Sequence, residues 1–197
     1  MEPPRVVQIT DASALPGSAL LARIASIAPL APERRRRFAV QLRDPGLTSR
    51  ALLQLGLRLR GATRAVDAAL IINDRLDLAV ALHADGVHLG RRSVCIADAR
   101  ALLGPDAWIS VACHSVDDVV RAATEGADAV TLSPIFASPG KGSSLGLAAI
   151  EAARKALGAR PIALHALGGV DLDNAASCFA AGADGVASIR ADLTLLL

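Results

Sequence analysis

Short apolar runs alternate with longer amphipathic stretches along the whole chain. The runs are rich in valine and isoleucine, as buried strands are, whereas the stretches between them repeat alanine and leucine at helical spacing. Strands are predicted at residues 6–10, 38–42, 69–73, 86–89, 108–112, 129–133, 161–167 and 185–189. Helices are predicted near residues 16–28, 48–60, 75–83, 95–104, 115–125, 146–157 and 172–181, with a short piece after Ala191.

This alternation predicts a parallel β-sheet that is covered by helices. Strands that are apolar on both faces suit a covered parallel sheet, and the helices between them supply the crossovers that parallel neighbours need. The segments HADGVHLG, EGADAVTLSP and AGADGVASIR each lead from a helix end through Ala-Asp into a strand, which is a weak internal repeat. Eight such units in 197 residues favour a single-domain (β/α)8 TIM barrel over residues 1–197. The alternative is a doubly wound open sheet, which usually has fewer strands and a glycine-rich first turn, whereas the first turn here reads TDASALPG.

Cap residues mark two of the predicted helix starts. Ser115 precedes VDDVV and places Asp118 three residues on, close to a capping box, and Asp171 precedes LDNAASCF. Both are predicted to act as N-caps.

Composition and charge narrow the class of protein. Hydrophobic residues make up 52% and charged residues 20%, with aromatics at 2%, which indicates a globular protein with an aliphatic interior. A net charge of +2 is too small to imply a nucleic-acid or membrane partner, and the run from Arg34 to Arg37 is interpreted as a solvated helix end or loop. Cys95, Cys113 and Cys178 fit no metal spacing, and their odd number argues against a disulfide framework. Without a leader or membrane-spanning pattern either, the chain is expected in the cytoplasm.

In such a barrel the functional residues follow the strands. The second strand ends in QLRD, where Gln41 and Arg43 share one face, and the arginine fork suits a phosphate or carboxylate. The alternative for Arg43 is a stabilising pair with Asp44 or Asp11.

Other polar residues follow the third, fourth and fifth strands. Asn73 and Asp74 are hard to explain as packing, and Asp74 could either bind a hard cation or cap the next helix. His88 and His114 are candidate acid–base groups or ligands, against the alternative of hydrogen-bonded core histidines. Cys113 is interpreted as packing.

Two segments late in the chain suggest phosphate binding. Gly168 and Gly169 follow the seventh strand, and together with backbone amides at the start of the last helix they are the usual phosphate site of such barrels. The loop SPIFASPGKGSSLG carries Lys141, one of only two lysines, which can reach over the barrel mouth toward a diphosphate or be an ordinary solvated residue. The loop is not a P-loop, because Gly142 follows the GK pair.

These segments together resemble the thiamine-phosphate synthase/TenI family. The resemblance covers residues 38–192 and rests on QLRD, IINDRLDLAVALHADGVHLG, HSVDDVVRAATEGADAVTLSPIF, the lysine loop, LGGVDLDNAASCFAAGADGVA and SIRA. It implies a (β/α)8 barrel, usually a homodimer, in thiamine biosynthesis. The synthase joins hydroxymethylpyrimidine diphosphate to thiazole phosphate with Mg²⁺. Departure of the diphosphate leaves a pyrimidine carbocation as the intermediate.

The resemblance also implies roles for individual residues. The pyrimidine diphosphate is assigned to Gln41, Arg43, Asn73 and Lys141, and Mg²⁺ to Asp74. The thiazole phosphate is assigned to Ser138, Gly168, Gly169 and the main chain at Ile189 and Arg190. Arg43 and Lys141 are the expected catalytic residues, because they can stabilise the charge of the leaving diphosphate, and His114 is a further candidate for proton transfer.

Several positions depart from the synthase pattern. Pro45 stands where a lysine is usual, Ser93 where the second metal carboxylate is usual, Ala112 in place of a serine and Gly140 in place of a threonine. The TenI branch, whose members isomerise a thiazole phosphate carboxylate without metal, also lacks the second metal-binding carboxylate. This chain differs from that branch in having Pro134 where the branch has its proposed catalytic histidine. Three hypotheses follow: a divergent thiamine-phosphate synthase, a TenI-like tautomerase, and a non-catalytic phosphate-binding barrel.

Overall fold

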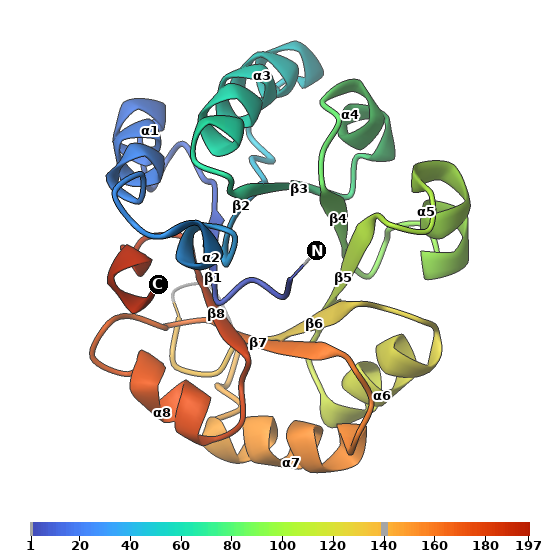
Figure 1. The fold of residues 1–197 in the computed structure, drawn as a ribbon. Helices are drawn as coiled ribbons and strands as arrows, with labels where there is room; N and C mark the ends of the chain where they lie inside the picture. The colour runs from blue at the N-terminus through green and yellow to red at the C-terminus, as the bar shows by residue number, and fades with distance from the viewer. Residues whose placement is uncertain (1, 139–141) are drawn as a thin grey trace.

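Eight parallel strands close into one barrel within residues 2–138 and 142–197, which are the residues that this computed structural model describes (Figure 1). The strands are β1 (Val6–Ile9), β2 (Phe38–Leu42), β3 (Ala69–Asn73), β4 (Gly86–Leu89), β5 (Trp108–Cys113), β6 (Ala129–Leu132), β7 (Ala163–Leu167) and β8 (Gly185–Ser188). Helices α1 (Gly17–Ser26), α2 (Pro32–Arg35), α3 (Ser49–Ala65), α4 (Leu76–Ala81), α5 (Ile96–Leu103), α6 (Val116–Thr124), α7 (Leu147–Leu157), α8 (Ala175–Ala180) and the 3₁₀ turn η1 (Thr194–Leu196) surround it. The predicted (β/α)8 barrel is confirmed, and β1 closes it by pairing with β8.

Most element boundaries fall within three residues of those predicted, but α3 continues to Ala65, five residues beyond its predicted end at residue 60. Helix α8 begins at Ala175, because Asp171 accepts hydrogen bonds from the N–H groups of Asp173 and Asn174 and thereby caps a turn that precedes the helix. Ser115 is an N-cap as predicted and accepts from the Asp118 N–H at 3.1 Å. Helix α2 was not predicted, and half of the arginine run lies in it.

The strands separate two apolar regions. Outward side chains such as Val40, Leu70 and Leu132 pack under the helices, where they form the main core. Inward side chains fill the barrel interior with a smaller cluster: Val7, Ile9, Ala39, Ala69, Ile71, Trp108, Ala129, Ala163 and Ala187. Because successive residues of a strand point to opposite sides, every strand except β4 contributes to both regions, which explains why most of the runs are apolar throughout.

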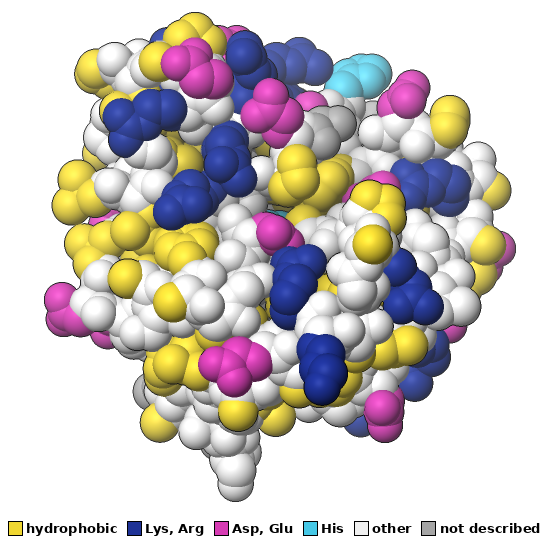
Figure 2. Space-filling view, turned by 60° about the horizontal axis from the view of Figure 1, so that its bottom comes forward, with side chains coloured by type: hydrophobic (Ala, Val, Ile, Leu, Met, Phe, Trp, Pro, Cys, Tyr) yellow, Lys and Arg dark blue, Asp and Glu magenta, His cyan; other side chains and the backbone are white. Residues whose placement is uncertain are grey.

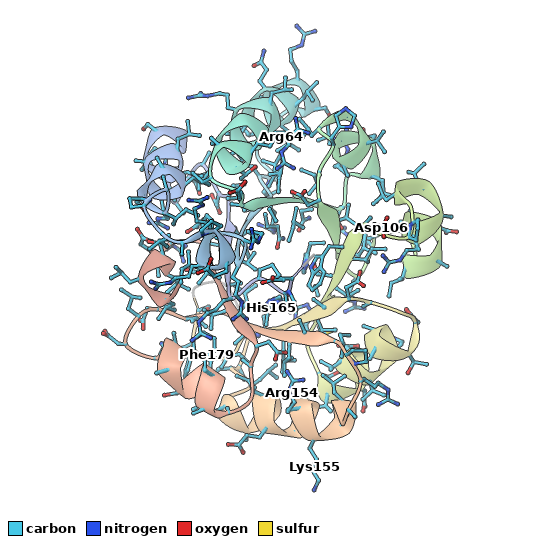
Figure 3. The ribbon with its side chains drawn as sticks, viewed as in Figure 1. Arg64, Asp106, Arg154, Lys155, His165 and Phe179 are labelled. Atoms are coloured by element: carbon cyan, nitrogen blue, oxygen red, sulfur yellow. The ribbon has the colours of Figure 1, made fainter. Side chains whose placement is uncertain are left out.

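Two large side chains fill this alanine-rich interior, and a glycine makes room for each. A Cβ on Gly86 would lie 2.1 Å from the Trp108 carbonyl oxygen, and one on Gly185 would lie 2.4 Å from the His165 ring. The His165 Nε2–H donates to the Pro4 carbonyl at 2.7 Å, which ties the N-terminal segment across the barrel opening seen in Figures 1 and 3. That opening is therefore the closed end of the barrel.

The Ala-Asp repeat has a structural role at this closed end. Asp85, Asp128 and Asp184 immediately precede β4, β6 and β8. Each carboxylate accepts from a backbone N–H of the preceding strand, at 2.7 to 2.8 Å, and pairs with an arginine of the helix before that strand. The arginines are Arg60, Arg100 and Arg154. The repeat thus joins a helix, a strand and the next strand in three units of the barrel.

Charged side chains elsewhere are mixed in sign. Figure 2 shows lysine and arginine side chains interspersed with acidic and hydrophobic ones on the face that it draws. No helix among the described residues is both long and apolar enough to cross a membrane.

Replacing Asp128 by alanine tests the repeat. The variant leaves the Ile109 N–H without its acceptor and removes the carboxylate partner of Arg100, which keeps only backbone carbonyl acceptors, so we expect the free energy of unfolding to fall by about 1–3 kcal/mol. Asp77→Ala is the control, because Asp77 is exposed and pairs only with its neighbour Arg75, and it should cost less than about 0.5 kcal/mol. Urea unfolding of both variants measures this, and equal losses would contradict the assigned role.

The interior histidine His88 predicts a pH dependence of stability. Burial lowers the pKa of His88 from 6.5 to about 4, so below pH 6.5 the unfolded chain binds a proton that the folded chain refuses. The free energy of unfolding should therefore fall as the pH is lowered from 7 to 5. The contribution of His88 to this change approaches about 1.4 kcal/mol per pH unit. Urea unfolding across this range should show a shallower slope for His88→Asn than for the wild type. An unchanged slope in His88→Asn would show that another group causes the effect.

Candidate functional site

The carboxyl ends of the strands and the loops after them form one rim, called the mouth below. The predicted site residues that the structure describes lie at or after the carboxyl ends of strands, so the barrel brings them to this rim. Lys141 and Gly140 lie outside the described residues. The predicted roles of the site residues remain predictions, and the geometry shows which of them lie together.

A chain of hydrogen bonds crosses the mouth from β2 to the turn after β4. Gln41, which is buried in the barrel, donates from Nε2 to Asn73 Oδ1 at 2.9 Å. Asn73 Nδ2 donates to Asp74 Oδ2 at 2.7 Å. Asp74 Oδ1 in turn accepts from the Gly90 N–H at 3.1 Å and from the Ser93 hydroxyl. Residues from three strands are thus held in one relay.

Asp74 can join this relay because of its backbone. Its φ of 59° lies in the left-handed region, which aspartate, asparagine and glycine tolerate best. In this conformation its N–H donates to the His88 carbonyl at 2.9 Å, while its side chain turns toward Gly90. Its predicted alternative, a cap of the next helix, is not seen, because Arg75 is the N-cap of α4 and no side chain caps it.

Arg43 is held by its main chain, and its side chain is left half-buried at the rim. Its N–H donates to Thr10 Oγ1 at 2.9 Å, and the Thr10 hydroxyl donates back to the Arg43 carbonyl at 3.0 Å. The Asp44 carboxylate instead accepts from the Ala12 and Gly46 N–H groups, and Asp11 accepts from Ser13. Among the ion pairs of the described residues none involves Arg43, so its guanidinium is not committed to Asp44 or Asp11.

The two candidate histidines differ. His88 is buried, bonds through Nδ1 to Ser110 Oγ at 2.9 Å and has its pKa lowered to about 4 by burial, so it is a neutral core histidine. His114 is exposed at the end of β5, and its Nδ1 lies 2.8 Å from the Ser133 carbonyl oxygen. Since a carbonyl only accepts, Nδ1 carries the proton and Nε2 is left as the second ring nitrogen. Burial raises the pKa of the Cys113 thiol to about 12, so it is inert packing as predicted.

The predicted phosphate segment is shaped by the glycine pair. Gly168 and Gly169 have φ of 99° and 64°, and a Cβ on Gly169 would lie 2.6 Å from the Ala137 carbonyl oxygen. The loop after β6 packs here, because the Ile135 and Phe136 N–H groups donate to the Leu167 and Gly168 carbonyls at 2.9 Å. This pairing brings Ser138, whose hydroxyl donates to the Phe136 carbonyl, into the same part of the mouth.

The end of β8 is held by residues that sequence reasoning missed. Gln8 Nε2 donates to the Ser188 and Ile189 carbonyls, and Arg23 donates to the Ala191 carbonyl and to Gln8 Oε1. The sequence sign of this role was Gln8 itself, a single polar side chain within the otherwise apolar run VVQI. The recorded hydrogen bonds between described residues do not use the N–H groups of Gly169, Ile189 and Arg190, which leaves three backbone donors for an anion.

The residues at Asp74 do not fit a Mg²⁺ site built by the protein. Magnesium favours six oxygen ligands in octahedral geometry, with carboxylates prominent among the protein ligands. Residues 2–138 and 142–197 contain no group of three or more histidine, cysteine, aspartate or glutamate side chains placed to hold a metal ion. Both Asp74 oxygens already accept hydrogen bonds from the protein, and Ser93 provides a hydroxyl beside them.

Two cavities, of about 450 and 460 Å³, open at the closed end of the barrel instead. Their walls are residues that precede strands, such as Ala84 and Ala107 in one and Pro161 in the other. Asp85, Asp128 and Asp184 line them and are paired with arginines, while Arg36 and Arg37 also line them and take part in no ion pair between described residues. The mouth combines Arg43 with the backbone N–H groups of Gly169, Ile189 and Arg190, and this combination makes it the better candidate for an anionic substrate.

Comparisons with known proteins show which family this chain resembles. Residues 8–191 match the family described as thiamine monophosphate synthase. The chain is 42% identical over 156 residues to the thiamine-phosphate synthase of Moorella thermoacetica, covering 78% of this chain and 73% of that protein. It is 45% identical over 155 residues to that of Methanoculleus marisnigri, covering 77% and 72%.

A solved structure extends the likeness to the fold. The thiamine phosphate pyrophosphorylase from Pyrococcus furiosus superposes with a TM-score of 0.76 at 28% identity, covering 94% of this chain and 85% of that chain. With a family match over nearly the whole barrel, the chain belongs to the thiamine monophosphate synthase family.

Proposed function

We propose that this protein is a thiamine-phosphate synthase that joins hydroxymethylpyrimidine diphosphate to thiazole phosphate and releases diphosphate. The observation that carries the proposal is identity above 40% to proteins named thiamine-phosphate synthase, over more than three quarters of the chain. The chain's own residues support it, because amide, arginine and backbone donors meet at one mouth. The protein therefore acts in thiamine biosynthesis.

The reaction breaks the carbon–oxygen bond between the pyrimidine methylene and the diphosphate. The electron pair leaves with the diphosphate, and the thiazole then attacks the carbocation that remains. Charge accumulates on the leaving group, so fixed cations beside it lower the barrier. We assign this role to Arg43, whose guanidinium is not paired with Asp11 or Asp44, and to Lys141 on the loop after β6. Gln41 and Asn73, which are already hydrogen-bonded to each other, are assigned to the pyrimidine diphosphate.

The thiazole phosphate is assigned to the opposite side of the mouth. Gly168 and Gly169 allow a phosphate to approach the main chain after β7. The hydrogen bonds that anchor the end of β8 fix the segment that carries the Ile189 and Arg190 N–H groups. Ser138 lies on the loop packed against this glycine pair and is assigned a contact to the same substrate.

For Asp74 the family resemblance implies a Mg²⁺ ligand. Substrate phosphates would have to supply most of the metal's ligands, because the protein side chains around Asp74 do not fit a cation site, and no step above depends on the metal.

The alternative functions are not favoured. The curated relatives are named synthases, and Pro134 follows β6 at the position that the tautomerase branch is proposed to use for its histidine. His114 has an oriented ring at the mouth and remains the candidate for proton transfer, with no substrate contact assigned to it. We further propose that residues 1–197 are one domain, and that the protein is a cytoplasmic homodimer with phosphorylated pyrimidine and thiazole as its ligands.

The purified protein should form thiamine phosphate from the two substrates. Product is measured by chromatography after conversion to a fluorescent derivative, with and without Mg²⁺, beside an active synthase as control. Arg43→Ala should reduce kcat/KM about 10²-fold or more, because a charge-assisted contact to the leaving group is lost. No product above background in either buffer would eliminate the proposed function.

The glycine pair allows a matched test of the phosphate site. Gly169→Ala should weaken binding of thiazole phosphate about tenfold or more, because its Cβ would displace the Ala137 carbonyl and with it the loop that carries Ser138. Gly104→Ala is the control: Gly104 also has a positive φ, but a Cβ there meets nothing within 4 Å. Both variants should lose about 1 kcal/mol or more of stability from the backbone, and only Gly169→Ala should lose affinity by calorimetry. Equal affinity in the two variants would place the phosphate elsewhere.

A further inference from the structure

The carboxylate of Asp74 is largely used by the protein itself. An ionised carboxylate has about four lone-pair positions for donors or a metal. Oδ1 of Asp74 accepts from the Gly90 N–H and the Ser93 hydroxyl, and Oδ2 accepts from Asn73 Nδ2. Three of the four positions are therefore occupied by protein donors.

These donors connect Asp74 to the turn that follows β4. Gly90 N–H also donates to Ser93 Oγ at 2.7 Å, and Ser93 N–H donates to the Gly90 carbonyl at 3.1 Å, so the turn from Gly90 to Ser93 is closed on itself. Asp74 reaches it from β3, across the pairing of Asn73 with His88. The carboxylate is thus the link that fixes this turn to the mouth.

The tip of the same turn carries two cations. Arg91 and Arg92 lie between Gly90 and Ser93, and both are exposed. Neither takes part in the ion pairs found between described residues. Because the turn follows the carboxyl end of β4, it lies on the rim beside Asn73 and Gln41, the residues assigned to the pyrimidine diphosphate.

We propose that Asp74 is a positioning residue and not a magnesium ligand: it anchors the Gly90–Ser93 turn so that Arg91 and Arg92 receive the diphosphate. This rests on the proposed function, since a diphosphate is the substrate group concerned. Arginine forks match phosphate oxygens and supply positive charge without a metal. Diphosphate binding then depends on the turn and not on Mg²⁺.

Two substitutions at Asp74 separate anchoring from metal binding. Asparagine and glycine both tolerate its φ of 59°, so neither adds backbone strain. Asp74→Asn keeps an oxygen for Gly90 and Ser93, and its new amide can donate to Asn73 if the Gln41 and Asn73 amides flip, which preserves the relay. Asp74→Gly removes every one of these contacts. Asp77→Asn is the control for loss of a nearby charge, because the one ion pair that Asp77 makes with a described residue is with Arg75.

Binding of inorganic diphosphate is measured by calorimetry in EDTA and in Mg²⁺, and Mg²⁺ alone is titrated as well. We expect wild type, Asp74→Asn and Asp77→Asn to bind diphosphate within about threefold of one another in both buffers, and Asp74→Gly to bind about tenfold more weakly in both. Mg²⁺ alone should give no saturable binding. Saturable Mg²⁺ binding to wild type that is lost in Asp74→Asn, or diphosphate binding that requires Mg²⁺, overturns the proposal.

The two arginines have their own charge-matched control. Arg91→Ala combined with Arg92→Ala should weaken diphosphate binding about tenfold or more. Arg64→Ala combined with Lys155→Ala removes the same charge from α3 and α7, where Figure 3 shows both residues on the outer helices, and should change the affinity less than about twofold. If the two double variants weaken diphosphate binding equally, the effect of Arg91 and Arg92 comes from the net charge of the protein and not from contacts in the turn. That result would overturn the assignment of the turn.

A measurement without ligand keeps this inference separate from the proposed function. Amide hydrogen exchange of residues 90–93 should accelerate about tenfold or more in Asp74→Gly and stay as in wild type in Asp74→Asn and Asp77→Asn. If no variant binds diphosphate, the synthase proposal fails while the exchange data and the Mg²⁺ titration still decide the role of Asp74. Unchanged exchange in Asp74→Gly would show that the carboxylate does not anchor the turn.

Discussion

The pairing of β1 with β8 is the constraint on which the rest of the structure depends. Because every strand is parallel in a closed cylinder, all carboxyl ends lie on one rim and all amino ends on the other. Residues as far apart in sequence as Gln8 and Ile189 are therefore hydrogen-bonded neighbours. The two rims serve different purposes. At the closed end Arg60, Arg100 and Arg154 pair with Asp85, Asp128 and Asp184 and hold helices to strands, whereas at the mouth no ion pair between described residues uses Arg43.

The mouth is polar but already internally bonded, and this explains how it can hold an ordered shape before a substrate arrives. Gln41, Asn73 and Asp74 satisfy one another across three elements, and Gln8 with Arg23 fixes the carbonyls after β8. What these contacts leave for a ligand are cationic side chains and backbone N–H groups, both of which favour anions. Preorganised donors cost little reorganisation when charge develops on a leaving diphosphate.

Much of the fold and the membership of the mouth could be predicted from the sequence, because strand periodicity and strand-end polarity are local signals. Helix α2 and the late start of α8 were missed, since a short helix has little periodicity and Asp171 caps a turn as readily as a helix. The roles of Gln8, Arg23 and Ser93 could not be predicted, because each depends on contacts with residues distant in sequence. The Ala-Asp repeat was visible, but its arginine partners lie 25 to 30 residues away in the chain.

A crystal structure with thiamine phosphate and diphosphate bound tests the central claim, that one mouth gathers the anion-binding groups of distant segments, most directly. The account predicts the ester phosphate against the N–H groups of Gly169, Ile189 and Arg190, and the diphosphate between Arg43 and the Gly90–Ser93 turn. Ligand found instead in the cavities at the closed end, or phosphates bound on separate surfaces, would contradict it.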